Sequence, residues 1–174
     1  RLSADIQQLI IRSSIPEDME QAITEAYREL EQECGQNVKV SLRSSALGED
    51  AAGTSFAGQF RTELNISPEN FGHAYKEVVA SKYGLPAITY RWSRGIPDED
   101  VAMCVGCMAM LNAVAGGVMY SRNPLNIRDR SVTINSVWGL PKAVVDGSVA
   151  PDVFVVSTDG SATITQKDVS IKER

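Results

Sequence analysis

The sequence of 174 residues has no long hydrophobic run, no excess of basic residues and little cysteine or histidine. No apolar stretch approaches the roughly 20 residues that a helix needs to cross a bilayer, so we expect no membrane partner. Lysine and arginine number 17 against 22 acidic residues, and the net charge of −5 offers no basic field for nucleic acid. Hydrophobic residues make up 43% and charged residues 22%, as in ordinary soluble globular proteins.

The three cysteines are too few, and odd in number, for a disulfide framework. Cys104 and Cys107 have the C-x-x-C spacing, but residues 101–111 have the pattern of a strand. Residues three apart on a strand point to opposite faces, so we expect no shared metal, and no second pair completes a zinc site. The single histidine, His73, has no nucleophile or second histidine at a readable spacing, so we expect a surface or partly packed residue of a helix and not a catalyst. Cytoplasmic location is the default expectation.

Helical periods dominate the first half of the chain, and two-residue periods dominate the second. Helices are predicted over residues 2–13, from a Ser14–Glu17 capping box to Gly35, and from Ser67 to about residue 94 with a break at Gly84. Strands are predicted at 38–43, 61–66, 101–111, 118–121, 132–137, a 152–166 hairpin and 169–174. Residues 101–111 are apolar on both faces, which predicts a central strand buried on two sides. The partial segregation of helices and strands favours an α+β fold.

The stretch VKVSLRSSALGEDAAGTSFAGQ, residues 38–59, holds the clearest candidate site. Alternation of apolar and polar residues predicts a half-buried strand that ends by presenting Arg43 at the edge of a small-residue loop. Guanidinium groups fork onto phosphate oxygens, and small residues let backbone N–H groups approach them, so an anionic ligand suits this stretch. The alternative is a structural ion pair between Arg43 and a nearby carboxylate such as Glu49 or Asp50.

Several motifs in order resemble the N-terminal nucleotide-binding domain of the phosphoenolpyruvate synthase and pyruvate phosphate dikinase family. They are R-S-S-A-L-G-E-D, S-F-A-G-Q, G-V-M-Y-S-R-N-P, W-G-L and V-V-D-G-S-V-A-P-D, within residues 16–156. The resemblance implies an ATP-grasp-like α+β fold, with helices mostly in the first half and antiparallel or mixed strands mostly in the second. It also implies that residues 1–174 are a partial nucleotide-binding domain, truncated at both ends relative to the family. The start at Arg1 instead of Met agrees with a piece of a longer polypeptide.

By this resemblance Arg43 corresponds to the family arginine that contacts the ATP phosphates. The Ser55–Gln59 stretch resembles the mobile loop that closes over them, and residues 108–111 fall where the family's hinge strand meets adenine. The resemblance thus implies nucleotide binding by Arg43, Ser44, Ser45, Ser55, Gly58, Met108, Met110 and Leu111. It also implies Mg²⁺ as a cofactor with its ligands outside this chain, because phosphoryl transfer requires charge neutralisation.

In family enzymes ATP phosphorylates a histidine on a separate swivelling domain, which carries the phosphoryl group to pyruvate. The resemblance therefore implies part of an ATP-dependent phosphotransferase, with no catalytic residue in this chain and no activity of the chain alone. Met108, where the family often has Gln, and Pro141-Lys142, where it has Gly-Glu, favour the alternative of a non-catalytic nucleotide-binding or interaction domain. An antibiotic or glucan acceptor is a further alternative. A half-complete cleft would expose apolar surface that packs on the missing part, so a homodimer is a further possibility for this chain.

Overall fold

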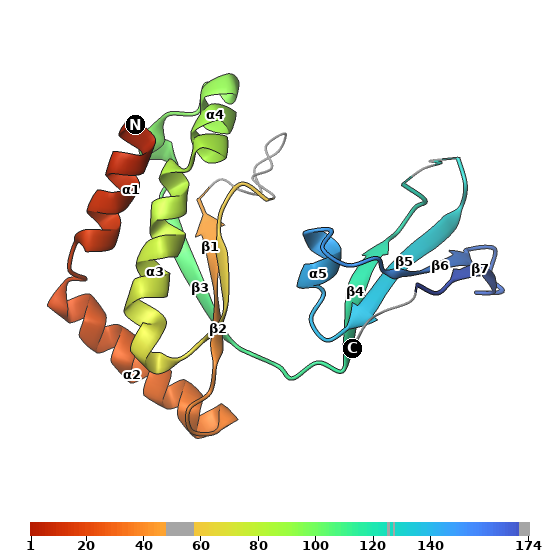
Figure 1. Cartoon of the computed structure of the whole chain (residues 1–174), viewed down its shortest axis with the longest axis horizontal. Coiled ribbons are helices and arrows are strands. Elements are labelled where there is room, and N and C mark those ends of the chain that lie inside the picture. Colours follow the sequence, from red (N-terminus) through yellow and green to blue (C-terminus); the bar gives the residue numbers. More distant parts are fainter. Residues whose placement is uncertain (48–57, 125, 127, 171–174) are drawn as a thin grey trace. The chain divides into compact units, whose positions relative to one another are not determined.

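The computed structural model describes residues 1–47, 58–124, 126 and 128–170. The chain divides into two compact units, residues 1–110 and 111–174. The first unit contains α1 (Leu2–Arg12), α2 (Glu17–Cys34), β1 (Val40–Ala46), β2 (Thr62–Ile66), η1 (Pro68–Asn70), α3 (Phe71–Ala80), η2 (Ser81–Tyr83), α4 (Leu85–Arg94), η3 (Asp98–Asp100) and β3 (Met103–Ala109). The second contains β4 (Ala115–Tyr120), β5 (Ser131–Trp138), α5 (Lys142–Val145), β6 (Asp152–Ser157) and β7 (Ile164–Asp168). The predicted α+β class, with helices mainly in the first half, is confirmed (Figure 1).

The first unit is a three-stranded antiparallel sheet, in the order β2–β1–β3, with helices packed on one of its faces (Figure 1). Val40 and Leu42 of the central strand are fully buried. They form one cluster with Tyr27 of α2 and with Ala74 and Val78 of α3. Because side chains alternate along a strand, this packing fixes which residues of β1 face the helices and which face away.

Helix α2 is attached to the unit chiefly through Tyr27, its one buried residue. The Tyr27 hydroxyl donates a hydrogen bond to the Val38 carbonyl oxygen, just before β1. Its ring meets the Phe71 ring edge-on, with centroids 5.9 Å apart. Burial raises the pKa of this phenol, and the Glu31 carboxylate adds to the effect. One side chain therefore links α2 to both β1 and α3.

The start of α2 differs from the prediction. The helix begins at Glu17, and Pro16 is its N-cap in an extended conformation with ψ of 141°. No side chain caps this end, so the predicted Ser14–Glu17 capping box is wrong. The physical reason is Pro16 itself, because a proline disfavours helical backbone at the residue before it.

Strand β3 lies at an edge of the first sheet, so the prediction of a central strand buried on two sides is wrong. Within the described residues β3 pairs only with β1, which is the central strand. Val105 of β3 packs on the helix-covered core. Cys104, Gly106 and Met108, on its other face, are exposed. Apolar residues on both faces of this strand therefore do not mean that both faces are buried, nor that a strand lies on each side.

The second unit is a four-stranded antiparallel sheet in the order β4–β5–β6–β7. The predicted hairpin is confirmed by the pairing of β6 with β7. Strands β4 and β5 approach closely at Gly117, where an added Cβ would lie 2.2 Å from the Asn135 carbonyl oxygen. Residues 169–170 have no regular secondary structure, and residues 171–174 of the predicted last strand lie outside the described part.

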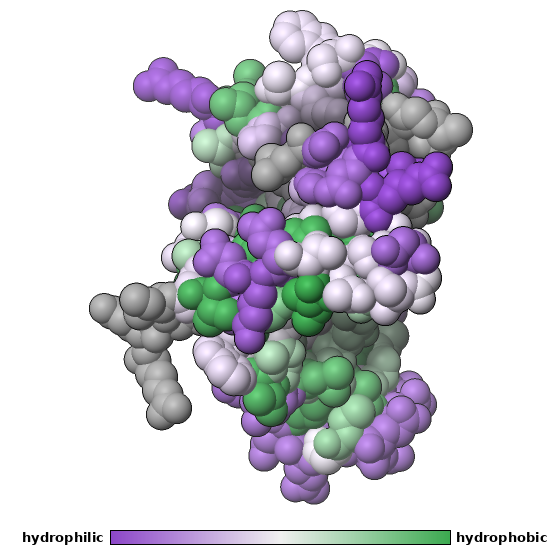
Figure 2. Space-filling model, turned by 90° about the vertical axis from the view of Figure 1, so that its right-hand side faces the viewer, coloured by the Kyte–Doolittle hydropathy of each residue, from purple (hydrophilic) through white to green (hydrophobic). Residues whose placement is uncertain are grey.

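Hydrophobic side chains also reach the surface among polar ones (Figure 2). The exposed large hydrophobic residues come from both units. Trp92 in the first unit is 87% exposed, and Trp138 in the second is 71% exposed. Such exposed side chains contribute little to either core. Among the described residues, none of the helices combines the length and apolar character that crossing a membrane requires.

Replacing Leu42 with Ala should lower the free energy of unfolding by about 2–5 kcal/mol, because truncation of a fully buried leucine leaves a cavity. Urea unfolding followed by circular dichroism measures the change. Leu9→Ala is the control, since Leu9 is 69% exposed and surface changes usually stay within about 0.5 kcal/mol. Equal effects of the two substitutions would contradict the assignment of the core to β1.

Candidate functional site

The face of the first sheet that points away from the helices gathers several of the predicted site residues. We call it the open face. The register of β1 and β3 places three pairs opposite one another on it: Arg43 with Gly106, Ser41 with Met108, and Ser45 with Cys104. The alternate residues, such as Leu42, point to the helix-covered face. The open face therefore combines one cation with hydroxyl, thiol and thioether groups on a rigid sheet.

Arg43 is the charged residue of β1 on the open face, and its side chain is exposed. It takes part in none of the ion pairs between described residues. Glu49 and Asp50, the carboxylates of the ion-pair alternative, lie outside the described residues. Strand β1 continues to Ala46, so the prediction that Arg43 ends the strand is wrong: pairing with β3 extends the strand through the serines. Gly106 lies opposite and adds no side chain, which leaves the surface beside the guanidinium open.

The two predicted serines lie on different faces of β1. Ser45 shares the open face with Arg43, whereas Ser44 is half-buried opposite Val105 on the helix-covered face. Ser41 shares the two-residue period of Arg43 and Ser45 and lies opposite Met108, but it is 4% exposed, so its hydroxyl is not available to a ligand.

The predicted small-residue loop is described only where it ends. Residues 48–57, and Ser55 with them, lie outside the described residues, so the role of Ser55 stays a prediction. Gly58 lies in a turn with φ of 73°, in the left-handed region that favours glycine. A residue with a side chain would be strained at this position, so Gly58 is suited to the turn by its backbone conformation.

Arg61 anchors the chain to α3 just after this turn. Its guanidinium pairs with Glu63 on β2 and with Glu77 on α3. Its backbone N–H donates to the Ser81 hydroxyl at 3.1 Å. His73, on the surface of α3 as predicted, has its Nε2 3.6 Å from the Glu77 carboxylate. These contacts fix the position of the backbone that leads into β2.

The predicted hinge segment, residues 108–111, includes the boundary between the two units. Met108 is 49% exposed on the open face. The Met110 backbone N–H donates to the Lys39 carbonyl at 2.8 Å and so ties this residue to the first sheet. Leu111 begins the second unit and is 79% exposed. The structure therefore brings Met108 to the face of Arg43 and leaves Leu111 beyond that sheet.

Cys104 and Cys107 both lie on β3, and both thiols are free. Cys104 is opposite Ser45 on the open face, while Cys107 is opposite Leu42 on the face toward the helices. Partial burial raises the pKa of the Cys107 thiol. Within the described ranges, no three His, Cys, Asp or Glu residues are grouped so that they could hold a metal ion.

The Pro141-Lys142 departure lies in the turn between β5 and α5. Gly139 has φ of 75°, and Pro141 is the N-cap of α5. Pro141 packs closely on β4, since a Cβ at Gly116 would lie 2.9 Å from its Cδ. Lys142 is exposed at the start of the helix. The turn is therefore tightly packed, and it presents a cation at the position where the family resemblance implies an acid.

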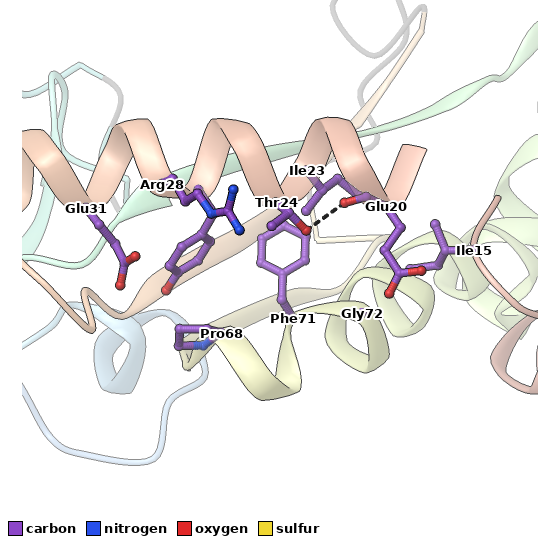
Figure 3. Close-up of a pocket in the computed structure, with 10 residues that line it drawn as sticks. Ile15, Glu20, Ile23, Thr24, Arg28, Glu31, Pro68, Phe71 and Gly72 are labelled. Atoms are coloured by element: carbon purple, nitrogen blue, oxygen red, sulfur yellow. Dashed lines mark hydrogen bonds between the residues drawn. The ribbon is translucent and has the colours of Figure 1, made fainter. Parts of the chain in front are cut away.

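A groove that no sequence pattern indicated lies between α2 and the η1–α3 segment (Figure 3). Its volume is about 320 Å³. We call it the α2 groove and define it by its lining residues: Ile15, Glu20, Ile23, Thr24, Tyr27, Arg28, Glu31, Pro68, Phe71 and Gly72. None of the predicted nucleotide-binding residues lines it.

Comparison with known proteins gives a match over the whole chain. The family described as "Pyruvate phosphate dikinase, AMP/ATP-binding domain" matches residues 1–174. The probable phosphoenolpyruvate synthase of Methanocaldococcus jannaschii is 38% identical over 173 residues, which are 98% of this chain and 14% of that protein. The phosphoenolpyruvate synthase of Pyrococcus furiosus is 35% identical over 170 residues, 97% of this chain and 21% of that protein. That of Escherichia coli is 38% identical over 161 residues, 90% of this chain and 20% of that protein.

Proposed function

Because the chain belongs to the family of pyruvate phosphate dikinase AMP/ATP-binding domains, we propose that it forms part of the ATP site of a phosphoenolpyruvate synthase-type phosphotransferase. The chain spans only 14% to 21% of the length of the three relatives compared above. In this proposal it is one part of an ATP-grasp-like domain within a longer protein. The observation that carries the proposal is the exposed Arg43, held on a rigid strand on the same face as Ser45 and Met108.

The phosphate end of the proposed site is Arg43 with Ser45. A guanidinium is permanently charged and presents donors in a planar fork that matches phosphate oxygens. Hydrogen bonds with a charged partner are roughly twice as strong as neutral ones. The Ser45 hydroxyl, on the same face and two residues along β1, supplies a neutral donor. The Arg43 backbone pairs with β2 and β3, and the Ser45 backbone pairs with β3, so the backbone that carries both groups is fixed before a ligand binds.

The adenine end of the proposed site is the exposed part of β3 and the segment that follows it. A thioether adapts to a flat aromatic ring, which suits the exposed Met108 for contact with adenine. The Met110 N–H points to β1, so the backbone groups of the preceding Ala109 point away from the sheet. The free edge of β3 therefore offers backbone donors and acceptors to the ring nitrogens.

The remaining chemistry is assigned to other parts of the longer protein. Mg²⁺ would neutralise charge on the phosphates, with its ligands outside the described residues of this chain. The phosphoryl group would pass to a histidine of a separate domain and then to pyruvate. This chain would bind and orient ATP without forming or breaking a bond. A cytoplasmic location and a homodimer stay predictions.

A non-catalytic nucleotide-binding domain is the second candidate function. Met108 replaces a residue that the family resemblance gives as Gln, and Lys142 reverses the charge of an expected acid. Lys142 is exposed, so its charge is available to a ligand or to solvent. Both functions require the same nucleotide contacts, and they differ in whether the longer protein transfers the phosphoryl group.

Replacing Arg43 with Ala should weaken ATP binding by about tenfold or more, because a hydrogen bond to a charged group contributes about 1.5–3 kcal/mol. Isothermal titration calorimetry with ATP measures the dissociation constant. Arg28→Ala is the matched control, since Arg28 lies exposed on α2, on the other side of the sheet, and should leave the affinity unchanged. Equal affinity of the Arg43 variant and the parent chain would make Arg43 a structural residue.

ATP should protect Cys104 from alkylation, because its exposed thiol lies on the open face beside Ser45. Peptide mass spectrometry after brief treatment with N-ethylmaleimide gives the rate at each cysteine. Cys34, exposed at the end of α2, serves as the internal control and should react equally fast with and without ATP. An unchanged rate at Cys104 under saturating ATP would place the nucleotide elsewhere.

The isolated chain should hydrolyse no ATP in the presence of Mg²⁺, because the proposed metal ligands and the phosphoryl acceptor lie in other parts of the longer protein. Release of inorganic phosphate, followed over hours at high protein concentration, measures this. Turnover that survives repeated purification and is lost in Arg43→Ala would contradict the assignment of the chemistry to other domains.

A further inference from the structure

The α2 groove has an apolar floor between two helices. Ile15 and Ile23 contribute aliphatic side chains from the α1–α2 side, and Phe71 contributes a ring from α3. Gly72 on α3 leaves room in the floor, since a Cβ there would touch only Ile15 Cδ1, at 3.4 Å. Figure 3 shows Glu20 and Glu31 near opposite ends of the groove, with Thr24 and Arg28 between them. The groove is therefore apolar inside and acidic at both ends.

A second hollow continues the apolar surface on the other side of Tyr27. It has a volume of about 250 Å³. Ile23, Tyr27 and Phe71 line both hollows. The second is completed by Ala26, Leu30, Tyr75, Val105 and Cys107. Two adjoining hollows along one helix suit an extended or helical polypeptide segment better than a single small molecule.

Helix α2 is the strongly acidic helix that forms one wall of the groove. Its sequence EDMEQAITEAYRELEQEC contains seven acidic residues and one arginine, a formal charge of −6, against −5 for the whole chain. None of these seven takes part in an ion pair within the described residues. Uncompensated negative charge along an apolar groove is complementary to a segment that is apolar on one side and basic at its margins.

We propose that the α2 groove docks a basic amphipathic helix of a partner protein. Its apolar side chains fill the space beside Ile23 and Phe71, and its Lys or Arg side chains pair with Glu20 and Glu31. These two glutamates are eleven positions apart on α2, about 16 Å along the axis. A docked helix parallel to α2 would then carry cations about eleven residues apart, with its apolar stripe between them. The interaction is independent of the nucleotide and lies on the helix-covered side of the first sheet.

The proposal is tested with a synthetic 15-residue helical peptide that has leucines along one face and lysines at positions 2 and 13. Fluorescence anisotropy measures its affinity for the chain. A second peptide with glutamate in place of lysine should not bind. In the double variant Glu20→Lys/Glu31→Lys, the dissociation constant of the lysine peptide should rise about tenfold or more. Each substitution replaces an ion pair between glutamate and a peptide lysine with repulsion between two lysines.

A matched double variant separates docking in the groove from general attraction to an acidic helix. Glu29→Lys/Glu33→Lys makes the same charge change on α2, but neither residue lines the groove. It should weaken binding by no more than about threefold, through screened long-range charge alone. Equal losses in the two double variants would overturn the proposal, because binding would then follow net charge and not the groove.

A third variant fills the groove without changing its charge. Gly72→Met adds a flexible apolar side chain at a helical position that lines the groove, and it improves helix propensity. Circular dichroism should show an unchanged fold, ATP affinity should stay the same, and peptide binding should be lost. Undiminished peptide binding to Gly72→Met would contradict docking in the groove. Absence of peptide binding to the longer protein would also overturn it, since another part of the same polypeptide would then cover the groove.

Discussion

The alternation of strand β1 between a buried face and an open face is the constraint on which the first unit depends. Val40 and Leu42 are fully buried against α2 and α3, and this burial fixes the orientation of every other residue of the strand. Arg43 is then obliged to point away from the helices, with Ser41 and Ser45 on either side of it. A slip of one residue in register would bury the guanidinium without a partner and expose the core. Packing on one face thereby positions the chemistry on the other.

The same sheet separates two surfaces of opposite charge. The proposed phosphate-binding arginine lies on the open face, while α2 with its seven acidic residues packs through Tyr27 on the covered face. Carboxylates placed near Arg43 would compete with phosphate for the guanidinium. Their placement on the far side of the sheet leaves the acidic helix available for a different interaction and keeps the cation available for an anion. In these two proposals, one small unit would offer two binding surfaces.

Local periodicity was sufficient to predict most elements, and it failed where the outcome depended on neighbours. Helix α1 and the β6–β7 hairpin follow from spacing alone, because their patterns repeat and their breakers are clear. The edge position of β3 was missed, since apolar residues on both faces say nothing of how many strands lie beside it. Arg43 was placed at a strand end because the serines after it carry no apolar period. Pairing with β3 extends the strand to Ala46, and the same register separates Ser44 from Ser45. The family motifs were sufficient to find the candidate segment around Arg43. The strand register was needed to show that Ser45, and not Ser44, shares its face.

We propose that ATP lies on the open face of the first sheet, with its adenine at the end of β3. Photolabelling of the chain with 8-azido-ATP, followed by mass-spectrometric mapping of the modified peptide, tests this placement. The expected result is a label within residues 104–111 that excess ATP suppresses. A suppressible label on α2 or α3 instead would contradict it.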